Sequence, residues 1–207
     1  MNNKVLYSLL AIIVLVAGAA TGVILVQQNQ TNAPKATVPD GIATIQLDPA
    51  TKLDLSVGDT FSVDIPFTTS GIAISGATVK LEYQYDSSSS QPPIAVTDVV
   101  PNTSLVNDHQ WRYTTTDYSA SNGTATISII AIDTSIDGYT ASGDTNLATI
   151  NFIVRSAGTV ALSFDLTETK ITAKSTGDDL LAPPANPAGT YSSTSTSNDD
   201  NVTPTPT

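Results

Sequence analysis

The residues that could carry out chemistry in this chain are few. Cysteine is absent, so the sequence offers neither a disulfide nor a thiolate nucleophile or metal ligand. His109 is the only histidine, so a serine nucleophile would need it as its base, and no Gly-x-Ser-x-Gly sequence is present. No pair of aspartates lies in a sequence context typical of a glycosidase acid and nucleophile. The sequence therefore predicts a protein that is not an enzyme.

Three aspartates in one segment could supply oxygen ligands to Ca²⁺, namely Asp133, Asp137 and Asp144. Their spacing does not match an EF-hand loop, which ends in a glutamate at its twelfth position. Solvated turn aspartates are the interpretation that we favour. We expect no cofactor and no metal site, with Ca²⁺ kept as an alternative.

Trp111 and Tyr113 alternate along one expected strand and therefore share a face. Planar aromatic rings stack well on sugars, so the pair could belong to a carbohydrate platform. Such a platform normally needs several aromatics in a line, and this chain has few. Packing in the core or at an edge is the interpretation that we favour for Trp111.

The charge balance of the chain is acidic. Its 207 residues include 19 acidic and 8 basic ones, for a net charge of −11. Nucleic acid binding needs clustered lysine and arginine, so a nucleic acid partner is not expected. Serine and threonine are abundant and glutamate is nearly absent, a composition that favours strands and polar turns over helices.

Composition divides the chain into four segments. Residues 1–26 contain Lys4 followed by the apolar run Val5–Val26, which is long enough for a membrane-spanning helix. We expect an uncleaved anchor that holds the domain outside the cell surface; the alternative is a cleaved signal peptide and a secreted protein. We expect a linker at 27–40, the folded domain at 41–192 and a disordered tail rich in Ser, Thr and Pro at 193–207.

The expected domain consists of short strands. Its clearest stretch is Val79–Asp86, where Val79, Leu81, Tyr83 and Tyr85 alternate with polar residues. Pro66 interrupts another alternating stretch and suggests an edge or a bulge. Turn signals separate about nine such strands, the pattern of a β-sandwich. Eight lie near residues 43–47, 61–67, 72–85, 94–100, 110–116, 124–133, 147–155 and 159–166, a weaker one lies near 171–173, and the short stretch 190–191 could close the sheet.

The order of these motifs resembles a known family. The series runs through residues 56–66, 74–86 (ending in Tyr85-Asp86), 94–101, 122–129, 147–154 and 158–164. In order and spacing it resembles the cohesin domains of cellulosome scaffolding proteins, over about residues 42–192. These domains share a superfamily with cellulose-binding modules of the family 2 and 3 type. The resemblance implies a nine-stranded jelly-roll β-sandwich that binds the dockerin module of another secreted protein.

The candidate partner-binding residues lie on expected outward positions. Matching backwards from Tyr85-Asp86 places Thr78 and Lys80 at the strand positions that the family uses to meet the dockerin, with Glu82 beside them. In the stretch 124–133 the alternation places Ile130 and Ile132 outward, where they would contact either a partner or a covering loop. The loop 133–140 corresponds to a family loop near the interface and adds Asp137 and Tyr139, although packing of Tyr139 onto its own loop is the interpretation that we favour for that ring.

The sequence thus predicts a non-catalytic extracellular module that docks a dockerin-bearing protein, such as a polysaccharide-degrading enzyme, at the cell surface. One alternative is a carbohydrate-binding module with a polysaccharide ligand. A second is a structural cell-surface domain.

Overall fold

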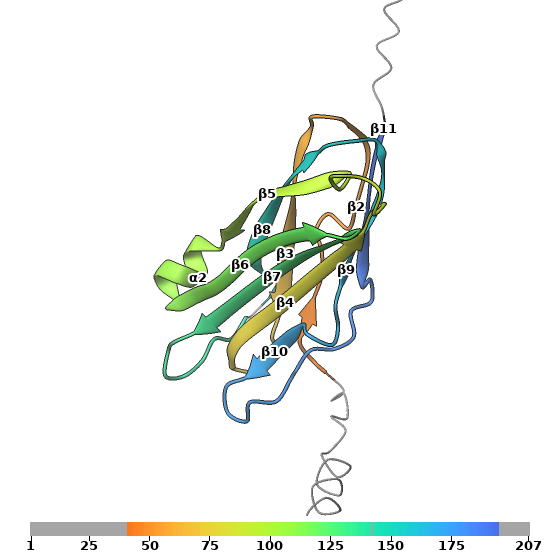
Figure 1. Cartoon of the computed structure of the whole chain (residues 1–207). Coiled ribbons are helices and arrows are strands. Elements are labelled where there is room, and N and C mark those ends of the chain that lie inside the picture. Colours follow the sequence, from red (N-terminus) through yellow and green to blue (C-terminus); the bar gives the residue numbers. More distant parts are fainter. Residues whose placement is uncertain (1–40, 142, 195–207) are drawn as a thin grey trace, which may run out of the picture. The chain divides into compact units, whose positions relative to one another are not determined.

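A computed structural model of the chain describes residues 41–141 and 143–194. These residues form a sandwich of two β-sheets, with one short helix, α2 (Thr103–Asp108), at one end (Figure 1). The all-β class expected from the alternation is confirmed. The anchor or signal segment expected at 1–26 and the linker expected at 27–40 lie outside the described residues. No helix in the described part of the chain is long and apolar enough to cross a membrane.

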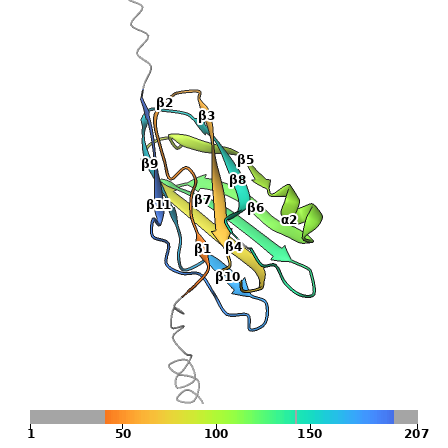
Figure 2. The same cartoon turned by 180° about the vertical axis from the view of Figure 1, so that it is seen from behind.

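One sheet has four strands in the order β1–β3–β8–β5, and all neighbours are antiparallel (Figure 2). The pairing of β3 with β8 shifts between Asp64 and Pro66. Proline has no N–H to donate to the ladder, so the bulge expected at Pro66 is confirmed. The strands are β1 (Thr44–Ile45), β3 (Thr60–Thr68), β5 (Ile94–Pro101) and β8 (Thr145–Val154).

The other sheet has seven strands, six of them in the order β2–β11–β9–β4–β7–β6. The seventh, β10, pairs with the first half of β4. β11 runs parallel to β2, and the remaining neighbours are antiparallel. The strands are β2 (Thr51–Ser56), β4 (Ile74–Gln84), β6 (Trp111–Ser121), β7 (Thr124–Asp133), β9 (Gly158–Phe164), β10 (Lys170–Ala173) and β11 (Ala188–Thr194).

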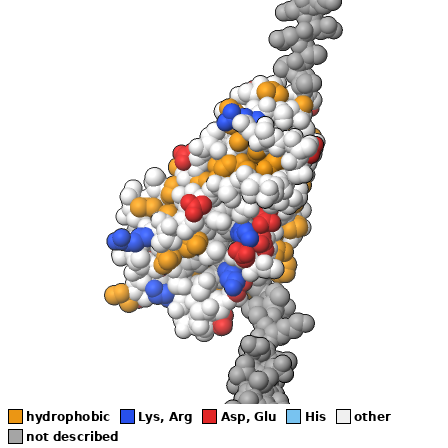
Figure 3. All heavy atoms as spheres, viewed as in Figure 1, with side chains coloured by type: hydrophobic (Ala, Val, Ile, Leu, Met, Phe, Trp, Pro, Cys, Tyr) orange, Lys and Arg blue, Asp and Glu red, His pale blue; other side chains and the backbone are white. Residues whose placement is uncertain are grey.

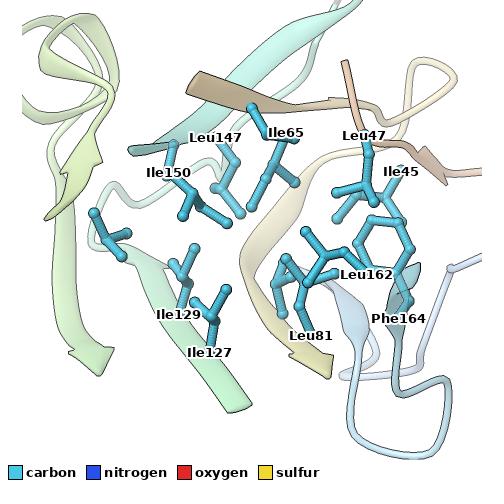
Figure 4. Close-up of a cluster of buried hydrophobic side chains, with 14 of the residues drawn as sticks. Ile45, Leu47, Ile65, Leu81, Ile127, Ile129, Leu147, Ile150, Leu162 and Phe164 are labelled. Carbon is cyan, nitrogen blue, oxygen red and sulfur yellow. The ribbon is translucent and has the colours of Figure 1, made fainter. Parts of the chain in front are cut away.

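The core lies between the sheets, because alternate residues of each strand point inward. Rings from both sheets stack there: Phe61 of β3 lies 5.1 Å from Phe152 of β8 and 5.3 Å from Tyr191 of β11, centroid to centroid. Within residues 41–141 and 143–194 these buried side chains form one continuous core. The close-up in Figure 4 includes the fully buried residues Ile65, Leu147 and Ile150 of one sheet and Leu81, Ile127 and Ile129 of the other.

Two expectations about the strands need correction. The described residues form eleven strands rather than nine, in part because β2 was not expected. Leu53 and Leu55 alternate in β2, but only Leu55 is buried, and the strand is held at the sheet edge by β11, far away in sequence. Moreover, β11 extends beyond the expected strand 190–191 as far as Thr194, because Ser193 pairs with Gly158 of β9 and Thr194 pairs with Ser56 of β2.

Candidate functional site

The outer face of the seven-stranded sheet brings together most of the expected partner-binding residues. In β4 the residues Thr78, Lys80 and Glu82 point outward between buried neighbours, as the alternation predicts. In the register with β7, Thr78 lies directly opposite Ile130, and Glu82 lies opposite Thr126. Four of the six expected residues are therefore adjacent on two paired strands: Thr78, Lys80, Glu82 and Ile130.

Lys80 is the centre of an ion-pair network on this face. Its ammonium nitrogen lies 3.0 Å from Glu168 Oε1, 3.1 Å from Asp165 Oδ2 and 3.3 Å from Glu82 Oε1. Figure 3, which looks onto this face, shows basic and acidic side chains side by side here. One positive charge thus faces three carboxylates, so the network is acidic overall.

The segment 165–169 brings two of these carboxylates to β4. The Thr169 hydroxyl accepts from the Lys80 N–H at 3.1 Å and donates to the Lys80 carbonyl at 3.2 Å. Asp165 closes the turn by accepting from the N–H and the hydroxyl of Thr167, at 3.0 and 2.6 Å. The segment is therefore attached to β4 through both backbone and side-chain contacts.

These contacts shift two pKa values. The Thr167 hydroxyl, and after it the Lys80 ammonium, hold the pKa of Asp165 at about 2, below its ordinary value. The Glu168 carboxylate, and after it Asp165, raise the pKa of Lys80 above its ordinary value. Both groups are therefore charged throughout the physiological range.

An apolar depression lies next to this network. Gly76 has no side chain, and the surface above it forms a hollow of about 300 Å³ bordered by Thr78, Ile130, Ile132 and Thr172. Ile132 is 42% exposed, so apolar surface borders the hollow. The two isoleucines point outward as expected, and no described loop covers Ile132.

The other two expected residues, Asp137 and Tyr139, lie in the loop after β7 and not on the outer face of β4 and β7. Asp137 is exposed. Tyr139 is half-buried: its ring packs against Trp111 at 5.5 Å and Phe67 at 6.1 Å, and its hydroxyl lies 3.2 Å from the Thr145 hydroxyl. Tyr139 therefore mainly secures the loop, which is joined to the start of β4 by backbone bonds to Ile74.

The aspartates considered for Ca²⁺ do not converge. Asp133 is buried and accepts from the N–H and hydroxyl of Ser135, at 3.0 and 2.7 Å. Asp137 and Asp144 are exposed. Among residues 41–141 and 143–194, no group of three acidic or histidine side chains is arranged to hold a metal ion.

The carbohydrate platform considered for Trp111 and Tyr113 is wrong. Trp111 is 1% exposed and packs in the core against Phe67. Tyr113 faces the same way, and its hydroxyl donates to the Leu147 carbonyl. The Trp111 ring is therefore not available to a sugar, and the half-buried Tyr113 alone does not make a platform.

Sequence reasoning did not predict that Gly76, Asp165 and Glu168 contribute to the outer face of β4 and β7. β4 is continuous through Ser75 and Gly76, and the glycine permits close approach of β7. A Cβ at position 76 would lie 2.5 Å from the Ala131 carbonyl oxygen. The only available signal was a glycine inside a strand pattern, which often marks close backbone contact.

Comparison with known proteins places this arrangement in a known fold. No family model matches the chain, and no curated protein matches it. A chain of a type I cohesin–dockerin complex from Clostridium thermocellum superposes with a TM-score of 0.52 at 14% identity, covering 78% of this chain and 99% of that one.

Two further structures are similar at lower TM-scores. CaCohA2 from Clostridium acetobutylicum has a TM-score of 0.49 at 23% identity and covers 76% of this chain and 94% of its own. A non-cellulosomal cohesin from the archaeon Archaeoglobus fulgidus has a TM-score of 0.46 at 18% identity, with coverages of 73% and 91%. On the strength of the Clostridium thermocellum structure, and in agreement with the resemblance in the sequence, this chain has the cohesin fold.

Proposed function

We infer that the domain is a non-catalytic, cohesin-like binding module that docks a dockerin-bearing protein through the outer face of β4 and β7. The inference draws on the Clostridium thermocellum relative in fold, which was solved as a cohesin–dockerin complex. The partner that we propose is a polysaccharide-degrading enzyme. The segment 1–26, outside the described residues, would hold the module at the cell surface.

The observation that carries this proposal is the composition of the face. Thr78 and Ile130 are paired neighbours beside an apolar hollow, and the charged group of Lys80 and Glu82 flanks them. Protein interfaces commonly have an apolar centre and a polar rim, and a few central residues carry most of the affinity. A sheet face without deep clefts suits another protein better than a small molecule.

The test is calorimetric titration of residues 39–207 with purified dockerin modules from the source organism. We expect binding to at least one dockerin, and we expect Ile130→Asp to weaken it by roughly thirtyfold or more, as for a central interface residue. The matched control is Thr159→Asp, an exposed position on β9 beside β11. It adds the same charge to the same sheet and should leave the affinity unchanged.

Two results would contradict the proposal. Binding of no dockerin by the folded module would remove the docking function, and binding to cellulose or chitin instead would favour the carbohydrate-binding alternative. A dockerin that binds the wild type and Ile130→Asp equally would move the docking site away from β4 and β7.

A further inference from the structure

The outer edge of β6 has backbone groups without a partner in the described part of the chain. β6 is the last strand of the seven-stranded sheet and pairs with β7 alone. Outside that ladder, the backbone of residues 111–121 forms no hydrogen bond with another described residue. Such an edge can template pairing with another strand.

The other sheet edges are protected in ways that natural proteins commonly use. β1 has two residues. β2 contains Lys52, and the φ of 59° at its residue Asp54 interrupts the regular strand. β5 has a register shift and ends in Pro101. By contrast β6 has eleven residues, no proline and no lysine, and its only irregularity is a shift between Tyr113 and Thr115.

There is room beside the first half of this edge. A surface groove of about 730 Å³ runs along residues 110–114, bordered by Val106 of α2 and Pro101 of β5. Figure 1 shows α2 beside the start of β6. An extended segment of a few residues fits such a space.

The charged residues of β6 indicate what kind of strand could pair with it. Arg112 and Asp117 are the only charged residues of the strand. Both face outward, because they lie opposite Ile132 and Ser128 of β7, and the bulge between them keeps them on one face. Residues opposite each other in an antiparallel pair share a face, and opposite charges there attract.

We propose that the free edge of β6 pairs with β6 of a second copy of this chain, antiparallel, with Arg112 opposite Asp117 of the second copy. The two-fold symmetry forms this ion pair twice. The same register places Tyr113 opposite Thr116, and both face inward because they lie opposite Ala131 and Ile129 of β7. The groove then accommodates the residues around Asp117 of the second copy.

The pairing has a consequence for docking, which rests on the proposed function. The symmetry axis of an antiparallel edge pair stands perpendicular to the sheet, so both outer faces point the same way. The dimer would present two docking faces to one surface and gain avidity for a partner with two dockerins. Dimerisation itself is measured without any dockerin, so its failure and the failure of docking are distinguishable.

The first test is sedimentation equilibrium of residues 39–207 at protein concentrations up to about 1 mM, a range that covers weak association. We expect a monomer–dimer equilibrium for the wild type. Arg112→Asp or Asp117→Arg, each alone, places like charges opposite each other twice and should raise the dimer Kd roughly tenfold or more. An equimolar mixture of the two variants restores both ion pairs and should form a heterodimer.

The matched control is Lys170→Asp on β10, an exposed position with the same change of charge as Arg112→Asp. It should leave the dimer Kd unchanged. Circular dichroism verifies that each variant is folded. A wild type that stays monomeric throughout, a dimer that tolerates the single charge reversals, or a mixture that does not associate would each overturn the proposal.

The second test uses the full chain, which has no native cysteine. Thr115→Cys lies next to the proposed symmetry axis and should form a disulfide-linked dimer on mild oxidation. Thr159→Cys, an exposed position on β9, is the control and should not. Equal cross-linking of the two variants would contradict the β6 pairing.

Discussion

The ammonium group of Lys80 lies 3.0 Å from the carboxylate of Glu168, although 88 positions separate the two residues in the chain. The contact joins the middle of β4 to the segment that connects β9 with β10. Because Asp165 and Glu82 share the same ammonium, the stability of this segment and the charge of the proposed docking face depend on one side chain.

Removing the charge of Lys80 should loosen this segment. Lys80→Met leaves Glu82, Asp165 and Glu168 without their shared cation, so we expect a lower Tm and faster amide hydrogen exchange in residues 165–169. The difference from wild type should shrink at high salt, because salt screens the interaction. Lys170→Met is the control, since Lys170 is exposed and forms no ion pair with another described residue. An unchanged exchange rate in 165–169 would mean that the network does not hold the segment.

Acid should destabilise the domain in a defined range of pH. The pKa of Asp165 is about 2 in the folded protein, against an ordinary value of 3.8, so its stabilisation is complete above that ordinary value and disappears as the pH falls from about 4 to about 2. The raised pKa of Lys80 matters at alkaline pH. Its contribution to the stability of the folded protein is lost only as the pH rises above the ordinary pKa range of lysine. Urea midpoints between pH 5 and pH 2 should fall less for Asp165→Asn than for the wild type. Parallel curves for the two proteins would exclude Asp165 as the titrating group.

Adding a methyl group at Gly76 should destabilise the sheet. The new Cβ would lie 2.5 Å from the Ala131 carbonyl oxygen, so β4 and β7 must separate, at a cost of about 1–3 kcal/mol. Gly143→Ala is the matched control, because its Cβ would have no neighbour within 4 Å and its φ lies outside the left-handed region. Urea unfolding measures the free energy of unfolding of both variants. Equal values would show that β7 moves aside without destabilising the sheet.

The hydroxyl of Tyr191 should contribute to stability separately from its ring. It donates to the Pro49 carbonyl at 2.8 Å, so Tyr191→Phe should lower the free energy of unfolding by about 0.5–1.5 kcal/mol. Tyr191→Leu also removes the stack on Phe61 and should cost more. Equal losses in the two variants would mean that the stack adds nothing beyond the hydrogen bond.

Local pattern was sufficient to predict the orientation of most strand residues. In β4 and β7 the period-two alternation correctly predicted that Val79, Leu81 and Ile129 are buried while Lys80 and Ile130 face outward. Pro66 likewise identified a bulge, because its missing N–H is a property of the residue itself. The same local logic could not identify β2, whose pairing with β11 is a long-range contact.

Local patterns could not predict the charge partners either, because these partners are also far apart in the chain. In the sequence Lys80 is one of several cations at outward strand positions, and nothing in the local pattern relates it to Glu168. Only the register of β4 with its neighbours and the turn at Asp165 bring the two together. The interpretation of Trp111 as a core residue, by contrast, needed only its alternation and the scarcity of other aromatics.

The sequence by itself determined that this is a sandwich of strands with one apolar side each, since side-chain alternation is a local consequence of extended backbone geometry. It also determined which residues of β4 and β7 face outward. Tertiary structure alone decided that Thr78 and Ile130 are neighbours, that Gly76 opens a hollow beside them, and that β6 ends the sheet with a free edge. These relationships depend on strand order and register, which arise from contacts between residues far apart in the chain.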